Sequence, residues 1–249
     1  MKSYECFASF YDDLTGNVDY KKLSEYFDSL IKKHSNGGNL ILDLACGTGS
    51  LSFELANKGY DVISVDASED MLSEAMNKPH TFGNPAFLNQ TMQELDLFGT
   101  IDGAVCTLDS INHLTSKEDV EGAIERVSLF MNEGGVFIFD VNTLYKHREI
   151  LGNNAFVYET DSVYCVWQNA YNDENASVNI SLDFFETQED GSYERYGEGF
   201  NEYFYDDDFL TTILDKYNFK VLEKYDDFTL NPVNDKTERI VYVCRKESK

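Results

Sequence analysis

The fold is decided by the segment Asn39-Leu40-Ile41-Leu42-Asp43-Leu44-Ala45-Cys46-Gly47-Thr48-Gly49-Ser50, which runs into Leu51-Ser52-Phe53-Glu54-Leu55-Ala56. An apolar run that ends in two closely spaced glycines, followed by helical apolar spacing, predicts a buried strand, a tight turn and a helix start. Glycine permits positive φ and close approach of a ligand, and the first turn of a helix offers unpaired N–H donors. A second strand, residues 61–65, ends on Asp66, whose carboxylate is placed to accept both hydroxyls of a ribose. The segment therefore predicts a nucleotide-binding turn.

Two ligand classes use this layout, and two residues distinguish them. A dinucleotide-binding fingerprint needs G-x-G-x-x-G, but Ser52 stands where the third glycine belongs. The first strand also contains an acidic residue, Asp43, where dinucleotide-binding folds keep the strand apolar. The pattern Asp43 to Gly49, with Asp66 downstream, instead resembles motif I and the acidic ribose-binding position of class I S-adenosylmethionine-dependent methyltransferases. The residues alone also leave open a glycine turn that binds no ligand.

This resemblance implies S-adenosyl-L-methionine as cofactor. It implies that Asp43 and the backbone of Ala45 and Gly47 hold its amino-acid end, and that Asp66 holds the ribose. Where relatives often have Gln-Asp-Met near the adenine, this chain has Gln90-Thr91-Met92, which leaves backbone groups and the Gln90 side chain for that contact. The full predicted cofactor set is Tyr11, Tyr20, Asp43, Ala45, Gly47, Gly49, Asp66, Ala67, Met71, Gln90, Thr91, Met92 and Leu108. Met71 is equally consistent with plain helix core.

Two tyrosines precede the first strand. Tyr11 lies in residues 7–14, an aromatic stretch that we expect to be turn-like. Tyr20 begins a helix with one apolar face, for which Asp19 is the expected N-cap. The resemblance implies that both tyrosines form a lid over the methionine half of the cofactor, and amphipathic packing is the alternative for each.

The acceptor side is predicted from the fourth strand, residues 101–106. Active-site groups in open parallel sheets lie outside the carboxyl ends of strands, where the strand order reverses. This makes Asp109 and Asn112, together with Tyr11, the predicted catalytic residues. The alternatives are that Asp109 only caps the turn and that Asn112 only serves its backbone. For His113, a loop histidine with no role is the simpler interpretation.

The remaining strands and helices complete an α/β fold. A helix capped by Ser116 is expected to run to Met131 and a fifth strand to occupy residues 136–141. Residues 154–205 alternate at period two between turn signals and predict an antiparallel β insertion, in which Trp167, Arg195 and Tyr196 line the site or build a packing face.

The predicted fold is therefore a Rossmann-like, doubly wound sheet of seven strands whose last strand is antiparallel, plus the insertion. We divide the chain into a lid and cofactor-binding core (1–153), an acceptor cap (154–205) and a C-terminal completion of the sheet (206–249).

Composition excludes several functions. The 249 residues carry 45 Asp+Glu against 20 Lys+Arg, a net charge of −25, which disfavours nucleic acids and anionic membranes as partners. The five cysteines are scattered and never form a CxxC pair, so we expect reduced thiols and no metal site. The N-terminus lacks a secretory apolar segment, and no apolar run approaches ~18 residues, so we expect a cytoplasmic protein.

The predicted function is transfer of a methyl group from S-adenosylmethionine to a small polar molecule, with amines as one candidate class. An NAD-dependent oxidoreductase and a non-catalytic S-adenosylmethionine-binding protein are the alternatives. The sequence assigns neither the acceptor nor an oligomeric state.

Overall fold

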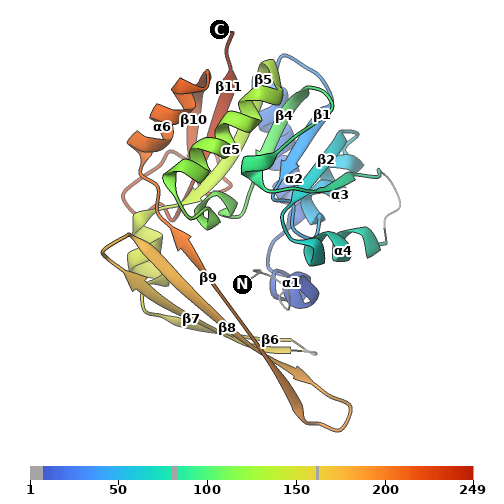
Figure 1. The fold of residues 1–249 in the computed structure, drawn as a ribbon, viewed down its shortest axis with the longest axis vertical. Coiled ribbons are helices and arrows are strands. Elements are labelled where there is room, and N and C mark those ends of the chain that lie inside the picture. The colour runs from blue at the N-terminus through green and yellow to red at the C-terminus, as the bar shows by residue number, and fades with distance from the viewer. Residues whose placement is uncertain (1–7, 80–82, 161–162, 249) are drawn as a thin grey trace.

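The computed structural model describes residues 8–79, 83–160 and 163–248. Its centre is a seven-stranded sheet in the order β10-β11-β5-β4-β1-β2-β3 (Figure 1). Neighbouring strands from β5 to β3 are parallel, whereas β11 is antiparallel to both β5 and β10. The strands are β1 (Leu40–Leu44), β2 (Asp61–Asp66), β3 (Ala86–Asn89), β4 (Ile101–Cys106), β5 (Met131–Asn142), β10 (Phe219–Asp226) and β11 (Arg239–Lys246). The predicted doubly wound sheet with an antiparallel last strand is confirmed.

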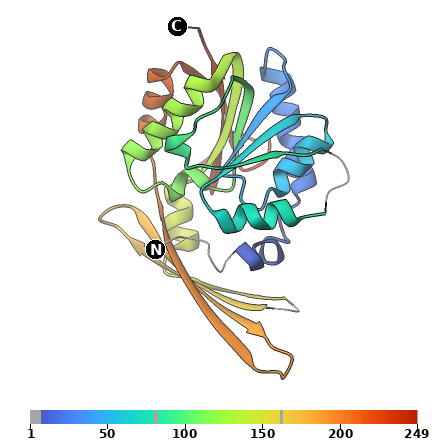
Figure 2. The same cartoon turned by 45° about the vertical axis from the view of Figure 1, so that its right-hand side comes forward.

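Helices cover both faces of this sheet, as the two views in Figures 1 and 2 show. Successive residues of a strand point to opposite faces, so Val136 and Ile138 pack with α2 and α3, while Phe137 and Phe139 pack with α5 and α6. The helices are α2 (Tyr20–His34), α3 (Ser50–Asn57), α4 (Glu69–Asn77), α5 (Lys117–Phe130) and α6 (Asp207–Lys216). Shorter helical turns are η1 (Met92–Glu94), η2 (Ser110–His113) and η3 (Lys146–Leu151). The expected N-caps of α2 and α5, Asp19 and Ser116, accept the backbone N–H groups of Lys22 and Asp119 as predicted.

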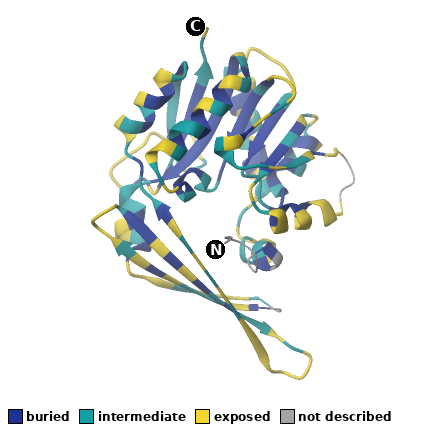
Figure 3. Cartoon of the chain, in the orientation of Figure 1, coloured by how far each residue is buried: buried dark blue, intermediate teal, exposed yellow. Residues whose placement is uncertain are grey.

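A second, antiparallel sheet is inserted between β5 and α6 and lies beyond the carboxyl ends of the parallel strands (Figure 1). It contains β6 (Ala155–Glu159), β7 (Val163–Asn172), β8 (Ser177–Thr187) and β9 (Tyr193–Tyr203). Buried and exposed residues alternate along its strands, so it has one inner face (Figure 3). The N-terminal helix α1 (Ala8–Leu14) packs on that face, with the rings of Phe10 and Phe184 stacked 5.5 Å apart.

Two local expectations are corrected. Residues 8–14 form helix α1 and not a turn-like stretch, because Ala8 and Phe10 bury their side chains in the core of the second sheet, which stabilises a helix too short to persist alone. Strand β5 begins at Met131, paired with Ile101, and an irregular register around residues 101–103 lets it continue through Gly134 and Gly135. Phe7 lies outside the described residues.

Other features of the described chain agree with the composition. The four described cysteines, Cys46, Cys106, Cys165 and Cys244, are free thiols, and Cys6 lies outside the described residues. Within the ranges that the structure describes, no helix combines the length and apolarity needed to cross a membrane.

Candidate functional site

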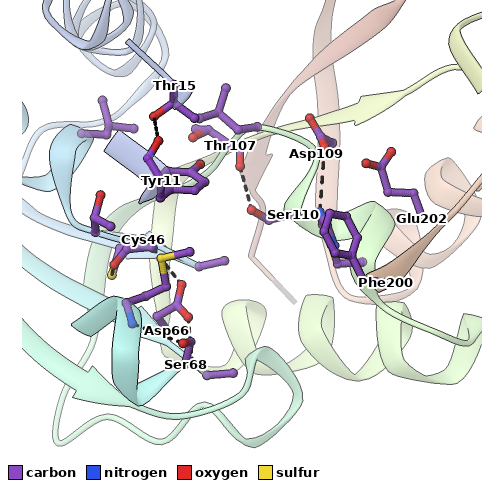
Figure 4. A pocket seen from close by; sticks show the side chains of 18 of the residues that line it. Tyr11, Thr15, Cys46, Asp66, Ser68, Thr107, Asp109, Ser110, Phe200 and Glu202 are labelled. Atoms are coloured by element: carbon purple, nitrogen blue, oxygen red, sulfur yellow. Dashed lines mark hydrogen bonds and ion pairs between the residues drawn. The ribbon is translucent and has the colours of Figure 1, made fainter. Parts of the chain in front are cut away.

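A cavity of about 1370 Å³ lies between the carboxyl ends of the parallel strands and the inner face of the second sheet. Figure 4 shows Tyr11, Cys46 and Asp66 on one side of it, and Asp109, Phe200 and Glu202 on the other. The structure brings most of the predicted site residues to this cavity. They are Tyr11, Tyr20, Asp43, Ala45, Gly47, Asp66, Ala67, Met71, Gln90, Thr91, Met92, Leu108 and Asp109.

Gly49 and Asn112 lie outside the cavity lining. Gly49 is the N-cap of α3 at φ 72°, and an added Cβ would lie 3.0 Å from the Phe87 ring, so this glycine serves the turn itself. Asn112 is fully buried. Its amide Nδ2 donates to the Tyr203 carbonyl at 2.8 Å, and its Oδ1 accepts from the Asn142 N–H at 2.9 Å. The expectation that Asn112 contacts an acceptor is corrected, because its side chain instead joins η2 to β9 and β5.

Asp43 is the most deeply buried acid of the nucleotide-binding turn. Its Oδ2 accepts from Ser52 Oγ at 2.5 Å, and Ser52 in turn accepts from Ser64 Oγ at 2.8 Å. Ser52 therefore has a definite task at the position where a dinucleotide-binding turn has glycine. Burial raises the pKa of Asp43 to about 7, against the opposing hydrogen bond from Ser52. Asp43 is thus poised to change its charge near neutral pH.

Asp66 holds the glycine turn and the start of α4 together. Its Oδ2 accepts from the Gly47 N–H at 2.7 Å and its Oδ1 from the Ser68 N–H at 2.8 Å. Burial raises the pKa of Asp66 from its ordinary value, while the N–H groups of Ser68 and Gly47 oppose that rise. The backbone opposite is open, since Ala45 and Gly47 have φ of 60° and 54° and a Cβ at Gly47 would meet no atom within 4 Å.

Helix α1 is tied to the glycine turn by a cluster that the sequence did not suggest. Asp12 Oδ1 accepts from Thr48 Oγ1 at 2.7 Å, and Asp12 Oδ2 lies 2.6 Å from Lys78 Nζ. Lys78, just after α4, also donates to Thr48 and to Ser50 at 2.9 and 2.7 Å. These bonds hold Tyr11, one residue away, over the cavity. Burial raises the pKa of Tyr11 well above its usual value, so its hydroxyl stays protonated.

The turn after β4 is built on two buried ion pairs. Leu108 and Asp109 both have φ of 57°, a strained value for Leu, and their N–H groups donate to the two oxygens of Asp140 at 2.8 Å each. Arg239 of β11 donates to Asp140 and, at 2.6 Å, to Asp109. Burial raises the pKa of Asp109, but the charges of Arg239, Lys146 and His113 outweigh it and hold that pKa below its usual range. Asp109 is therefore a permanent carboxylate and a weak proton acceptor.

The cavity residues that the sequence analysis did not name include Arg239 and Glu202. Glu202 is 2% exposed, and its Oε2 accepts from Asn142 Nδ2 at 2.8 Å and lies 3.3 Å from His147 Nε2. Its position in phase with the inward residues of β9 was the only available signal. Of the three residues proposed for the insertion, Trp167 lines the cavity.

The other two lie outside the cavity lining. Arg195 bonds to Asp183 at 2.7 Å on the exposed side of the sheet. Tyr196 builds the packing face, with its ring 6.3 Å from that of Phe10 and its hydroxyl donating to Glu186 at 3.3 Å. Both serve the second sheet itself.

Comparisons with known proteins agree with this geometry. A family model described as a methyltransferase domain matches residues 41–135. A protein of Geobacillus sp. (strain WCH70), provisionally named a methyltransferase, is 32% identical over 246 residues, which cover 98% of this chain and 100% of the relative. The crystal structure of an S-adenosylmethionine-dependent methyltransferase from Clostridium acetobutylicum superposes with a TM-score of 0.86 at 34% identity, covering 98% of this chain and 99% of that one. A glycine/sarcosine N-methyltransferase of Halorhodospira halochloris is 26% identical over 97% of this chain and 87% of its own length.

Proposed function

Since the chain belongs to the S-adenosylmethionine-dependent methyltransferases, we propose that it transfers the methyl group to the nitrogen of a small polar amine. The cofactor of the family is S-adenosylmethionine, whose sulfonium supplies an electrophilic methyl group. The amine as the acceptor is supported by the buried carboxylate of Glu202 in the cavity lining and by the activity named for the Halorhodospira halochloris relative.

The residues around the glycine turn fit the cofactor. The open backbone at Ala45 and Gly47 leaves room that a Cβ at Gly47 would fill, and Asp43 presents a carboxyl group to the same space. In this proposal Asp43 and the Ala45 and Gly47 backbone bind the amino-acid end, and Asp66 binds the ribose hydroxyls. The adenine contacts are Ala67, Met71, Gln90, Thr91 and Met92, with Leu108 beside them.

The observation that supports an amine as the acceptor is the buried carboxyl group of Glu202. A buried carboxylate is costly unless a cation or several donors compensate it, and one of its oxygens already has the neutral amide of Asn142 as partner. Glu202 lines the cavity next to Asp109. An acceptor that arrives as an ammonium ion supplies the missing positive charge, whereas a hydroxyl or a carbon acid does not.

The chain contributes mainly by orientation. Holding donor and acceptor in line is worth ~7–11 kcal/mol, and an activated methyl group needs little further help. Tyr11 and Tyr20 line one side of the cavity and the second sheet lines the other, so in this proposal they shield bound donor and acceptor from bulk water. Residues 154–205 act in this proposal as the acceptor cap, beside the core of residues 1–153 and 206–249. The ammonium nitrogen must lose a proton before it attacks, and Asp109 is too acidic to take it efficiently. In this proposal the Glu202 carboxylate takes the proton, and the nitrogen lone pair then forms the bond to the methyl carbon as the methyl–sulfur bond breaks and neutral S-adenosylhomocysteine leaves.

The test is a methylation assay with S-adenosylmethionine and a panel of primary amines, alcohols and phenols. Mass spectrometry detects S-adenosylhomocysteine and the methylated product together. We expect N-methylated products, a large loss in Glu202→Gln, and no change in Asp61→Asn, which alters an exposed residue of β2. Methylation confined to alcohols or phenols would contradict the amine, and cofactor binding without turnover on any acceptor class would favour a sensor protein.

A further inference from the structure

The cavity wall opposite the glycine turn is aromatic and apolar. It is built by side chains on the inner face of the second sheet, which point the same way because strand residues alternate at period two. The residues are Tyr158 of β6, Cys165 and Trp167 of β7, Leu182 of β8 and Phe200 of β9. A small hydrophilic acceptor such as glycine makes no use of such a surface.

The polar atom of the largest side chain on this wall is already satisfied within its own strand. Trp167 Nε1 donates to Asn169 Oδ1 at 2.6 Å, so its ring is left as an apolar and π surface. The ring of Tyr158 lies 6.3 Å from that of Trp167, and Phe200 lies 5.0 Å from the imidazole of His113. Aromatic rings in such positions bind another flat ring by offset stacking or edge contacts.

The wall has one acidic corner. Glu202 lies two residues beyond Phe200 on the same face of β9, and Figure 4 shows the two side chains next to each other and to Asp109. Arg239 is shared by Asp109 and Asp140, and Lys146 Nζ donates to Asn142 Oδ1 at 2.9 Å. Glu202 has the Asn142 amide and the imidazole of His147 as partners, and no Lys or Arg of the described residues forms an ion pair with it. Glu202 is therefore the acidic group at the edge of the aromatic surface that lacks a Lys or Arg partner.

The size of the cavity agrees with an acceptor larger than an amino acid. Its volume of about 1370 Å³ exceeds the roughly 300–1,000 Å³ of common ligand pockets. The lining extends from the glycine turn to the second sheet, so space remains on the Trp167 side when a nucleoside-sized cofactor fills the turn.

We propose that the acceptor is an aromatic amine whose ring lies against Trp167 and Phe200 and whose ammonium group binds Glu202. This inference rests on the proposed N-methylation and narrows it, since it makes glycine-sized amino acids poor acceptors. A divalent metal is a poorer occupant of the same corner. Asp109, His113 and Glu202 bring ligand atoms within 4.8 Å of one another, but the Asp109 carboxylate that a metal would need is already engaged by Arg239, whereas an ammonium group needs only Glu202.

The test uses Trp167, the only tryptophan of the chain, as a reporter inside the site. Wild-type protein saturated with S-adenosylhomocysteine is titrated with 2-phenylethylamine, ethylamine and 2-phenylethanol, and indole fluorescence is recorded. We expect saturable binding of 2-phenylethylamine. Ethylamine, which lacks the ring, and 2-phenylethanol, which lacks the charge, bind at least about tenfold more weakly.

Variants separate the two contacts. Glu202→Gln abolishes the preference for 2-phenylethylamine over 2-phenylethanol, and Phe200→Leu reduces the preference for 2-phenylethylamine over ethylamine. Glu194→Gln, an exposed position on the same strand, keeps both preferences. The ligand comparison in the wild-type protein needs no variant to fold.

Three binding results overturn the inference. One is equal binding of ethylamine and 2-phenylethylamine, and another is equal binding of the amine and the alcohol. The third is displacement of 2-phenylethylamine by Mg²⁺ or Zn²⁺ alone, which assigns the corner to a metal. Methylation of glycine or ethylamine but not of 2-phenylethylamine refutes this inference and leaves the proposed N-methylation standing. Binding of 2-phenylethylamine with methylation only of alcohols refutes the proposed N-methylation and the amine as acceptor, and leaves only the contacts of the aromatic ring and the ammonium group standing.

Discussion

Arg239 Nη2 lies 2.6 Å from Asp109 Oδ1, which joins the last strand of the sheet to the turn after β4. The same guanidinium also pairs with Asp140, whose carboxylate holds the strained N–H groups of Leu108 and Asp109. One side chain near the C-terminus therefore compensates two buried carboxylates and shapes the middle of the cavity.

Replacing Arg239 by Gln should lower the free energy of unfolding at pH 7 by about 3–5 kcal/mol, because two buried carboxylates lose their cation. Urea denaturation measures the loss. Arg239→Lys is the matched control and should lose less, since it keeps the charge but not the two-pronged geometry. A Gln variant as stable as the wild type would mean that the ion pairs contribute nothing net.

The pH dependence of that loss has a definite sign. The pKa of Asp109 lies below its usual range, so its contribution is complete above about pH 4 and is lost as the pH falls through the folded-state pKa. The stability difference between wild type and Arg239→Gln should therefore shrink in acid. A difference that stays constant down to the acid limit would contradict this pairing.

Asp66→Asn should weaken S-adenosylmethionine binding by about ten- to hundredfold, because charge-assisted bonds of a carboxylate are replaced by neutral ones. Folding should suffer by only about 1 kcal/mol, since the Asn oxygen still accepts one of the N–H bonds from Gly47 and Ser68. Calorimetric titration measures the affinity. Asp61→Asn, at the exposed start of the same strand, should bind like the wild type, and equal affinities in both variants would remove Asp66 from the site.

The strand, glycine turn and helix around Gly47 could be predicted because their parts are close in sequence. Asp43, Gly47 and Ser52 lie within ten positions, and Asp66 follows on the next strand, so local patterns alone place them together. The sheet was predictable for the same reason, as each strand had its own apolar run and turn signals. Helix α1 was missed because its stability comes from packing on β8, more than a hundred residues away.

The contacts on the acceptor side of the cavity could not be predicted from the sequence, because their partners are far apart along the chain. Asp109 and Arg239 are 130 positions apart, and Asn142 and Glu202 are 60 apart, so no local pattern relates them. Asn112 was misassigned because a polar residue at the end of a strand has two uses, contact with a ligand or support of the backbone. The hydrogen bond from Asn112 to the Tyr203 carbonyl of β9, which no local pattern indicates, shows that Asn112 supports the backbone.

Breaking the cluster that ties α1 to the glycine turn should speed cofactor exchange. In Lys78→Met, Asp12 loses its ion pair and Thr48 and Ser50 lose a donor, so α1 opens more often. Stopped-flow measurement of S-adenosylhomocysteine release, followed by Trp167 fluorescence, should show a dissociation rate several times that of the wild type. Lys78→Arg keeps the charge and should stay near the wild-type rate. Equal rates in the Met variant would mean that α1 does not gate the cavity.

The raised pKa of Asp43 predicts how cofactor affinity depends on pH. Burial raises its pKa to about 7, so below that pH the carboxyl group is neutral and has no charge to offer the ammonium group of the cofactor. If the bound state needs the carboxylate, affinity should rise about tenfold between pH 6 and pH 8. Calorimetric titration across this range measures the rise.

Asp43→Asn is the matched control, because the amide keeps the shape and a polar contact to Ser52 but does not titrate. The amino group of the cofactor titrates equally with both proteins, so the difference between their two pH profiles belongs to Asp43. The variant should bind weakly and lack the rise between pH 6 and pH 8. If both profiles have the same slope, Asp43 does not contact the amino-acid end, and its buried carboxyl group serves only the bond to Ser52.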